Sequence, residues 1–103
     1  MLSGAAAFHT KHLHFLPKME EKRVSKDELI SYCMDNLGIT EKEKDLVTMV
    51  GDRSYDIIGA KKRGVYSIGV LYGYGSEKEL TDAGADALAH DADELGRIIL
   101  SRP

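Results

Sequence analysis

The sequence predicts an α/β fold, in which a small parallel sheet carries helices on both faces. Helix-start signals and short apolar runs alternate from residue 25 to the end of the chain. The apolar run at residues 46–50 is continuous instead of alternating, which is typical of a strand buried on both faces of a parallel sheet. Strands separated by helices of this length imply right-handed βαβ crossovers, and these place helices on both sides of the sheet.

The first helix is predicted to begin after Ser25, because Ser25 and Glu28 have the spacing of a capping box. Apolar residues then recur at helical spacing as far as Leu37, and a glycine follows. Thr40 and Glu43 repeat the capping pattern and predict a second, shorter cap.

The remaining elements alternate in the same way. We expect strands at residues 46–50, 65–70 and 85–89, and helices at residues 54–63, 76–84 and 91–100. A glycine-rich turn at residues 72–75 precedes another capping box, formed by Ser76 and Glu79. Three strands make a narrow sheet, so we expect that further strands of the complete fold are missing.

Composition restricts the class of protein. The 103 residues suffice for one small domain, and 14 Lys and Arg stand against 17 Asp and Glu. This charge balance argues against a nucleic-acid-binding face, and the short apolar stretches cannot span a membrane. Cys33 is the single cysteine and cannot form an internal disulfide, so a reducing, cytoplasmic location fits best.

The N-terminal segment differs from the rest of the chain. Residues 1–17 contain no acidic residue and hold three of the four histidines, His9, His12 and His14. Three histidines on a loose segment more often bind nothing specific than a metal, and we expect a poorly ordered start to the chain.

Two carboxylates follow the first predicted strand. Asp52 lies just past this strand, and Asp56 lies one helical turn further on. Ligands bind at the carboxyl ends of strands in open α/β sheets, and two close carboxylates resist ionisation unless a cation joins them. Mg²⁺ is the natural partner for such an oxygen site. The alternative, that both aspartates only cap and charge the first turn of the helix, is about as well supported by their spacing.

The wider sequence favours the metal site. It resembles the fourth conserved motif and the following segment of haloacid dehalogenase-like (HAD) hydrolases, most closely the phosphoglycolate phosphatase-like branch. The matching residues are Gly51-Asp52-Arg53, Asp56-Ile57-Ile58-Gly59-Ala60-Lys61, Gly64-Val65, Ile68-Gly69-Val70, Gly73-Tyr74-Gly75-Ser76, Glu79-Leu80, Ala83-Gly84-Ala85-Asp86 and Asp93-Glu94-Leu95. The resemblance implies that residues 23–103 are the C-terminal part of a HAD-like, Rossmann-like three-layer core domain, whereas residues 1–22 do not match.

The resemblance also implies roles for individual residues. Asp52 would be a side-chain ligand to Mg²⁺, and Asp56 a second ligand, either direct or through water. Residues 24–30 look like the third conserved motif, in which Lys26 would hold the transferring phosphoryl group and neutralise charge at the nucleophile. The alternative for Lys26 is a solvated lysine in the first helical turn. Gly51 and the glycines of residues 73–75 would let the backbone approach the site, although plain turn geometry also explains the later pair.

Other parts of the family pattern are absent. The family reaction begins with an aspartate in a D-x-D-x-T/V motif at the end of the first strand, and no aspartate precedes Lys26. The second-motif serine or threonine is not recognisable, since neither Ser3 nor Thr10 follows a predicted strand. Asp91 and Asp93 form a D-x-D, but at the wrong end of the chain, where helix capping explains them. The cap domain, which selects the substrate, is also missing, and we expect no activity from the chain alone.

In the family fold the missing first strand lies beside the strand at residues 46–50. We therefore expect an unpaired edge there, marginal stability, and association with a second copy or another chain through that edge. The first functional hypothesis is part of a phosphatase acting on small phosphorylated metabolites, and the second is a non-catalytic remnant that binds a partner. A receiver-like signalling domain is a third hypothesis, which the non-acidic N-terminus disfavours.

Overall fold

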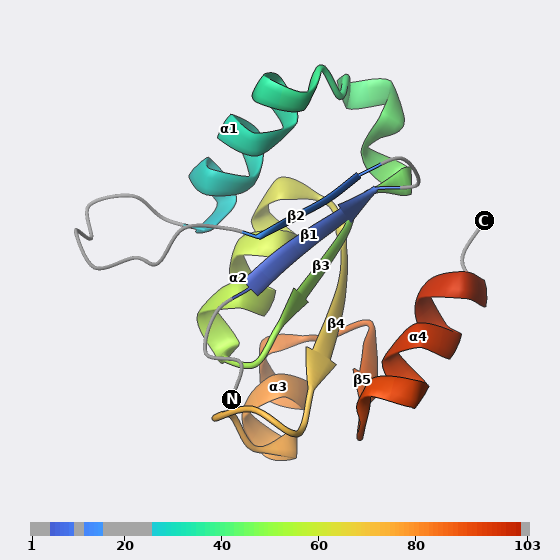
Figure 1. Cartoon of the computed structure of the whole chain (residues 1–103). Coiled ribbons are helices and arrows are strands. Elements are labelled where there is room, and N and C mark those ends of the chain that lie inside the picture. Colours follow the sequence, from blue (N-terminus) through green and yellow to red (C-terminus); the bar gives the residue numbers. More distant parts are fainter. Residues whose placement is uncertain (1–4, 10–11, 16–25, 102–103) are drawn as a thin grey trace.

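A computed structural model describes residues 5–9, 12–15 and 26–101. These residues form one five-stranded sheet, of order β2-β1-β3-β4-β5, with helices on both sides (Figure 1). The elements are β1 (Ala5–His9), β2 (His12–Phe15), α1 (Lys26–Leu37), the 3-10 helix η1 (Glu41–Leu46), β3 (Thr48–Gly51), α2 (Ser54–Arg63), β4 (Tyr66–Val70), α3 (Glu77–Ala83), β5 (Ala87–Ala89) and α4 (Ala92–Ser101). No helix in the described part of the chain is both long and apolar enough to cross a bilayer.

The predicted parallel sheet is confirmed. β3 pairs in parallel with β4, where Val50 lies opposite Ile68, and β4 pairs in parallel with β5, where Val70 lies opposite Ala89. Each predicted helix also occurs, although Ser25, the expected cap of α1, lies outside the described residues. The Thr40 N–H donates to Glu43 Oε1 over 3.0 Å, as a capping box requires, and the helix that follows is 3-10.

The expectation that β3 has an unpaired edge is wrong. β1 pairs antiparallel with β3, with Ala5 opposite Gly51 and Phe8 opposite Thr48, and β2 then pairs antiparallel with β1. Both strands fall within residues 1–22, for which we expected poor order. The exposed edge of a buried strand is a row of free N–H and C=O groups, and even a segment with weak strand propensity can pair with it. The division of the chain at residue 23 stays a prediction.

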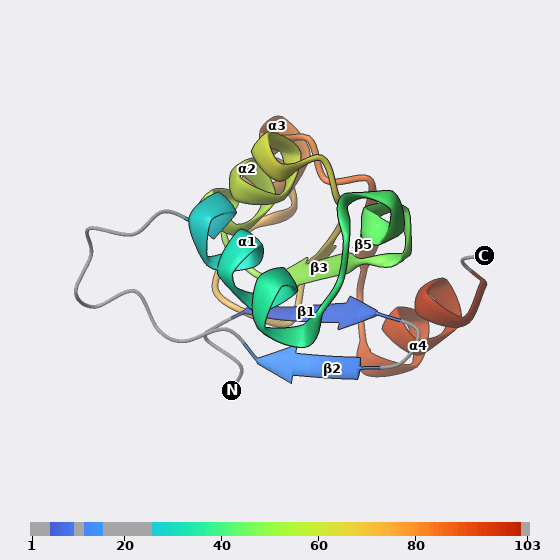
Figure 2. The ribbon, with the colours of Figure 1, turned by 90° about the horizontal axis from the view of Figure 1, so that it is seen from above.

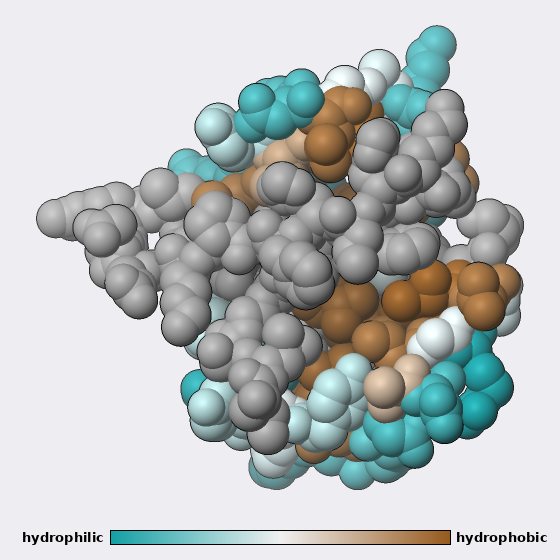
Figure 3. All heavy atoms as spheres, in the orientation of Figure 1, coloured by the Kyte–Doolittle hydropathy of each residue, from teal (hydrophilic) through white to brown (hydrophobic). Residues whose placement is uncertain are grey.

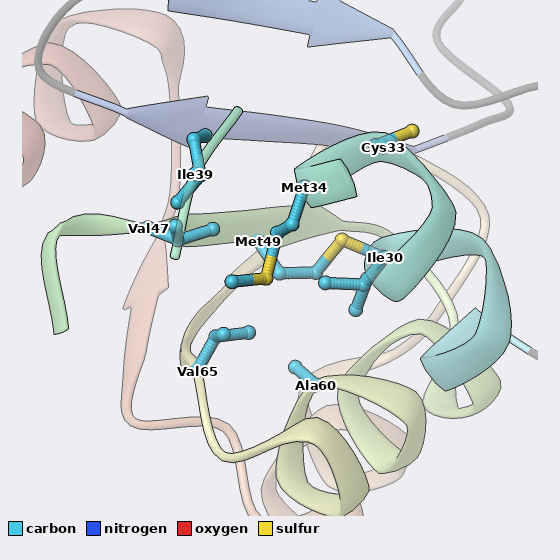
Figure 4. Close-up of a cluster of buried hydrophobic side chains, with 8 residues drawn as sticks. All are labelled: Ile30, Cys33, Met34, Ile39, Val47, Met49, Ala60 and Val65. Atoms are coloured by element: carbon cyan, nitrogen blue, oxygen red, sulfur yellow. The ribbon is translucent and has the colours of Figure 1, made fainter. Parts of the chain in front are cut away.

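One face of the parallel strands packs against α1, α2 and α3. Figure 4 shows side chains of α1, β3 and α2 pointing toward one another in a buried apolar cluster. The cluster consists of Ile30, Cys33, Met34, Ile39, Val47, Met49, Ala60 and Val65. The buried thiol of Cys33 has no disulfide partner, and burial raises its pKa. Its predicted role as a small core hydrophobe is confirmed.

The opposite face has thinner cover. There Val50, Ile68, Val70 and Ala89 form a second buried cluster, against which α4 packs. α4 lies on the other side of the sheet from α1, α2 and α3 (Figure 2). It has no fully buried residue, and its Leu100 is 85% exposed. Hydrophobic atoms gather over the sheet and along α4 on the face shown in Figure 3.

A polar link connects β4 with the turn before β5. Asp86 Oδ2 accepts hydrogen bonds from the Ser67 N–H over 2.9 Å and from Ser67 Oγ over 3.2 Å. The Asp86 N–H donates in return to the Ser67 carbonyl oxygen over 3.0 Å. Because Ser67 is fully buried, these bonds satisfy polar groups that water cannot reach.

The adjacent residues Ile57 and Ile58 of α2 provide a test of the packing. Ile57 is 0% exposed and Ile58 is 45% exposed. We expect Ile57→Ala to lower the free energy of unfolding by about 2–5 kcal/mol, because the substitution leaves a cavity. Ile58→Ala, which removes the same atoms, should cost less than about 1 kcal/mol. Chemical denaturation of both variants measures the difference, and equal losses of stability would contradict the burial of Ile57 and the exposure of Ile58 in α2.

Candidate active site at the carboxyl end of the sheet

The structure brings Asp52 and Asp56 together at the carboxyl end of β3. Asp52 directly follows this strand, and Asp56 lies in the first turn of α2. Each residue is only 1% exposed. Asp52 Oδ2 accepts a hydrogen bond from the Tyr74 N–H over 3.0 Å, and Asp56 Oδ2 accepts one from the Arg53 N–H over 3.2 Å. Two carboxylates from consecutive elements therefore occupy one buried region.

The helix-capping alternative applies to only one of them. Arg53 is the N-cap residue of α2, and Asp56, three residues later, accepts its N–H. Asp56 thus stabilises the first turn of the helix, whatever else it does. Asp52 precedes the cap and bonds to the distant Tyr74, so capping of α2 does not account for its burial.

One oxygen of Asp52 has no donor within the part of the chain that the structure describes. Asp52 Oδ1 is buried and accepts no hydrogen bond from any residue in the described ranges. A buried carboxylate oxygen without a donor is costly, whereas a bound cation would satisfy it. Within the same ranges no group of three or more His, Cys, Asp or Glu side chains could hold a metal ion. Asp52 and Asp56 would therefore supply only part of the ligands of a hard cation.

Glycines make the approach to these aspartates possible. A Cβ added to Gly73 would lie 2.4 Å from Asp52 Oδ2, and one added to Gly51 would lie 2.6 Å from Asp56 Oδ2. Real side chains do not come so close, so both positions need a residue without a Cβ. For Gly73 this close contact, and not turn geometry alone, explains the glycine.

Sequence reasoning missed the role of Glu79. Ser76 Oγ accepts the Glu79 N–H over 3.0 Å, as a capping box predicts. The Glu79 carboxylate, however, reaches across to α2, where Oε2 accepts from Arg53 Nε over 2.9 Å and from the Ser54 N–H over 2.8 Å. The bond to Arg53, followed by the bond to Ser54, lowers the pKa of Glu79, so this link persists at neutral pH and is lost as the pH falls through the lowered value. The only signal in the sequence was a capping-box glutamate, which predicts a local contact.

Arg53 and Tyr55, which lie between the two aspartates in the chain, contact each other. The Arg53 guanidinium lies over the Tyr55 ring, 5.7 Å from its centroid. Burial, and then the charge of Asp56, raise the pKa of Tyr55. Tyr55 is 49% exposed and is therefore a neutral phenol at physiological pH.

The other residues considered in the sequence analysis are Lys26, Ser3, Thr10 and Asp91, and the structure describes only some of their side chains. Lys26 is the first residue of α1, but its side chain is outside what the structure describes, so its phosphoryl-binding role stays a prediction. Ser3 and Thr10 also lie outside the described residues. Asp91 Oδ1 accepts the Glu94 N–H over 2.8 Å just before α4, which agrees with its interpretation as a helix cap.

Comparison with known proteins decides the family. A sequence profile of the HAD-hydrolase-like family matches residues 24–95, which is more than half of the chain. The chain belongs to the HAD-like hydrolase family. The match contains both aspartates of the site, and it confirms the resemblance inferred from the motifs.

Relatives of this HAD-like chain are phosphatases. It is 41% identical over 63 residues to a 5'-nucleotidase of Pseudomonas aeruginosa, and 38% identical over 52 residues to a phosphoglycolate phosphatase of Vibrio cholerae. Its fold matches the crystal structure of a Clostridium difficile protein assigned as a phosphatase, with a TM-score of 0.70, 46% identity and coverage of 76% of the chain. The chain spans only 27% and 23% of the two curated relatives, and 35% of the Clostridium difficile protein.

Substitution of Gly73 tests the close contact with Asp52. We expect Gly73→Ala to destabilise the protein by about 1–3 kcal/mol, because the new methyl group overlaps the Asp52 side chain. The matched control is Gly96→Ala in α4, where an added Cβ meets no atom within 4 Å. Alanine favours a helix there and should stabilise by about 0.5–1 kcal/mol. Thermal unfolding of both variants compares them, and a neutral Gly73→Ala would count against the packing described.

Proposed function

We propose that this chain is the C-terminal part of a Mg²⁺-dependent phosphatase that hydrolyses phosphate monoesters. The observation that carries the proposal is the buried Asp52, whose Oδ1 accepts no hydrogen bond from the described residues. A second buried carboxylate, that of Asp56, follows in the first turn of α2. A divalent cation would compensate both negative charges at once, and carboxylate oxygens are the ligands that Mg²⁺ prefers. The names of the relatives support a phosphorylated substrate.

Each residue of the site would have a distinct task. Asp52 and Asp56 would hold the ion, and the Tyr74 N–H would orient Asp52 through its Oδ2. Bound Mg²⁺ would neutralise charge on the phosphate and polarise its oxygens. Lys26 would contribute a second positive charge to the phosphoryl group, since phosphoryl transfer depends mainly on positioning and positive charge.

The site is incomplete in the proposed reaction. Two carboxylates supply fewer oxygens than the six that Mg²⁺ requires, so waters, substrate and other protein groups would complete its coordination. The nucleophilic aspartate of the family would also come from outside this sequence, as no D-x-D-x-T/V motif occurs before Lys26. The substrate class is a small phosphate monoester, and phosphoglycolate is one member of it. The unpaired, buried Cys33 supports a cytoplasmic setting.

Hydrolysis of p-nitrophenyl phosphate tests the proposed incompleteness. The purified chain should show no turnover above background with or without Mg²⁺, because it carries metal ligands but no nucleophile. Asp52→Ala serves as the control. Turnover that requires Mg²⁺ and disappears in Asp52→Ala would mean that the chain has a nucleophile of its own, and Asp91 would be the next residue to substitute.

A second candidate function is partner binding without catalysis. The apolar side of α4 favours it, since Leu95, Ile98 and Ile99 are only partly buried and Leu100 is 85% exposed. A second copy of this chain, or a longer relative, would cover these side chains and the outer edge of β2. This candidate replaces association through the edge of β3, which β1 occupies.

Sedimentation equilibrium tests this second candidate. If the face of α4 binds another copy, Leu100→Glu should raise the dissociation constant about tenfold, because a charge would enter an apolar contact. Tyr32→Glu is the control, since Tyr32 is 64% exposed on α1, on the other side of the sheet. A wild-type chain that stays monomeric at all concentrations would rule out self-association, and equal effects of the two substitutions would exclude this face.

A further inference from the structure

The loop between β4 and α3 packs against Asp52. Within this loop the Tyr74 N–H donates to Asp52 Oδ2 over 3.0 Å, and Gly73 packs against the Asp52 side chain. Gly75 touches the Asp52 backbone so closely that an added Cβ would lie 2.2 Å from the carbonyl oxygen. The orientation of Asp52 therefore depends on how this loop is held against the turn between β3 and α2.

Besides the Tyr74–Asp52 bond, Glu79 makes a polar connection between these two segments. Its Oε2 accepts from Arg53 Nε and from the Ser54 N–H, over 2.9 and 2.8 Å. Arg53 and Ser54 are the two residues that follow Asp52 in the chain. Glu79 itself stands in the first turn of α3, directly after the loop that donates to Asp52. The Glu79 carboxylate thus links the start of α3 to the two residues that follow Asp52.

The local needs of α3 do not explain this arrangement. Ser76 already caps α3 by accepting the Glu79 N–H over 3.0 Å. In an ordinary capping box the glutamate side chain would return to the backbone of the cap residue. Here the Glu79 carboxylate instead accepts one charge-assisted hydrogen bond from Arg53 and one from the Ser54 N–H at the start of α2.

We infer that Glu79 is a positioning residue for Asp52, which holds the β3–α2 turn against the β4–α3 loop so that the Asp52 carboxylate is fixed for cation binding. The inference rests on the proposed metal role of Asp52. Glu79 does not touch the ion in this scheme; it acts through Arg53, Ser54 and the loop that contains Tyr74.

Mn²⁺ binding to the full ¹⁵N-labelled chain tests the inference. Mn²⁺ replaces Mg²⁺ as the probe because it broadens nearby amide signals even when it binds weakly. The variants are Glu79→Gln and Glu79→Ala, with Glu77→Gln as the matched control in the same turn of α3. Glu79→Gln and Glu77→Gln remove the same charge, but only Glu79 contacts α2 through hydrogen bonds. Exchange of the Tyr74 amide with deuterium reports in parallel on the bond to Asp52.

We expect Glu79→Ala to weaken Mn²⁺ binding about tenfold, as for other outer residues that orient a metal ligand. Glu79→Gln should weaken it less, because the amide oxygen can still accept the Ser54 N–H. Glu77→Gln should leave the affinity unchanged. Tyr74 amide exchange should accelerate in Glu79→Ala and, less, in Glu79→Gln. Circular dichroism at the titration temperature checks that each variant is folded; if Glu79→Ala is not, the comparison of Glu79→Gln with Glu77→Gln decides.

The possible contrary results are separable. Equal losses of Mn²⁺ affinity in Glu77→Gln and Glu79→Gln would overturn the inference, since the effect would then be one of charge alone. Unchanged exchange of Tyr74 in both Glu79 variants would also overturn it. Absence of Mn²⁺ broadening around Asp52 in the wild-type chain would instead overturn the proposed metal function, and Tyr74 exchange would then judge the positioning role of Glu79 by itself.

Discussion

The burial of the Asp52 carboxylate is the constraint on which the carboxyl end of this sheet depends. A charged group at 1% exposure must be compensated by donors or by a cation, and here one oxygen has the Tyr74 N–H while the other has no donor among the described residues. The surrounding structure is arranged around this group. Gly73 and Gly75 bring the loop within contact distance, and Glu79 anchors that loop to α2. The same arrangement would be expensive to keep in a protein that had no use for the charge.

Much of this structure could be predicted from local patterns. The continuous apolar run before Asp52, the helix caps and the glycine stops predict the parallel strands and their helices, because backbone sterics and hydrogen bonding act over a few residues. The D-x-x-x-D spacing likewise predicts that Asp52 and Asp56 share one region. The boundaries are less exact. Leu46 was predicted to begin the first strand, but it is the last residue of the 3-10 helix, and β3 starts at Thr48.

The contacts that local patterns did not predict are those between distant segments. Glu79 looked like half of a capping box, and Asp86 fell within the strand predicted at residues 85–89, yet each accepts a hydrogen bond from a backbone N–H far away in the sequence. β1 and β2 were also missed, because alanine-rich and histidine-rich runs carry a weak strand signal and their pairing depends on an edge that another part of the chain supplies. The phosphoryl-binding role of Lys26 stays a prediction, because its side chain lies outside what the structure describes.

The direction of β1 bears on any experiment in which a second polypeptide supplies the other strands of the family fold to this chain. β1 runs antiparallel to β3, with Ala5 beside Gly51, so it advances away from Asp52 and ends at the opposite margin of the sheet. It occupies the edge at which the family fold would place the parallel strand that bears the nucleophile. A complementing polypeptide would therefore have to compete for that edge and displace β1 before it could dock. The rate at which such a polypeptide binds would then depend on how readily β1 and β2 separate from β3.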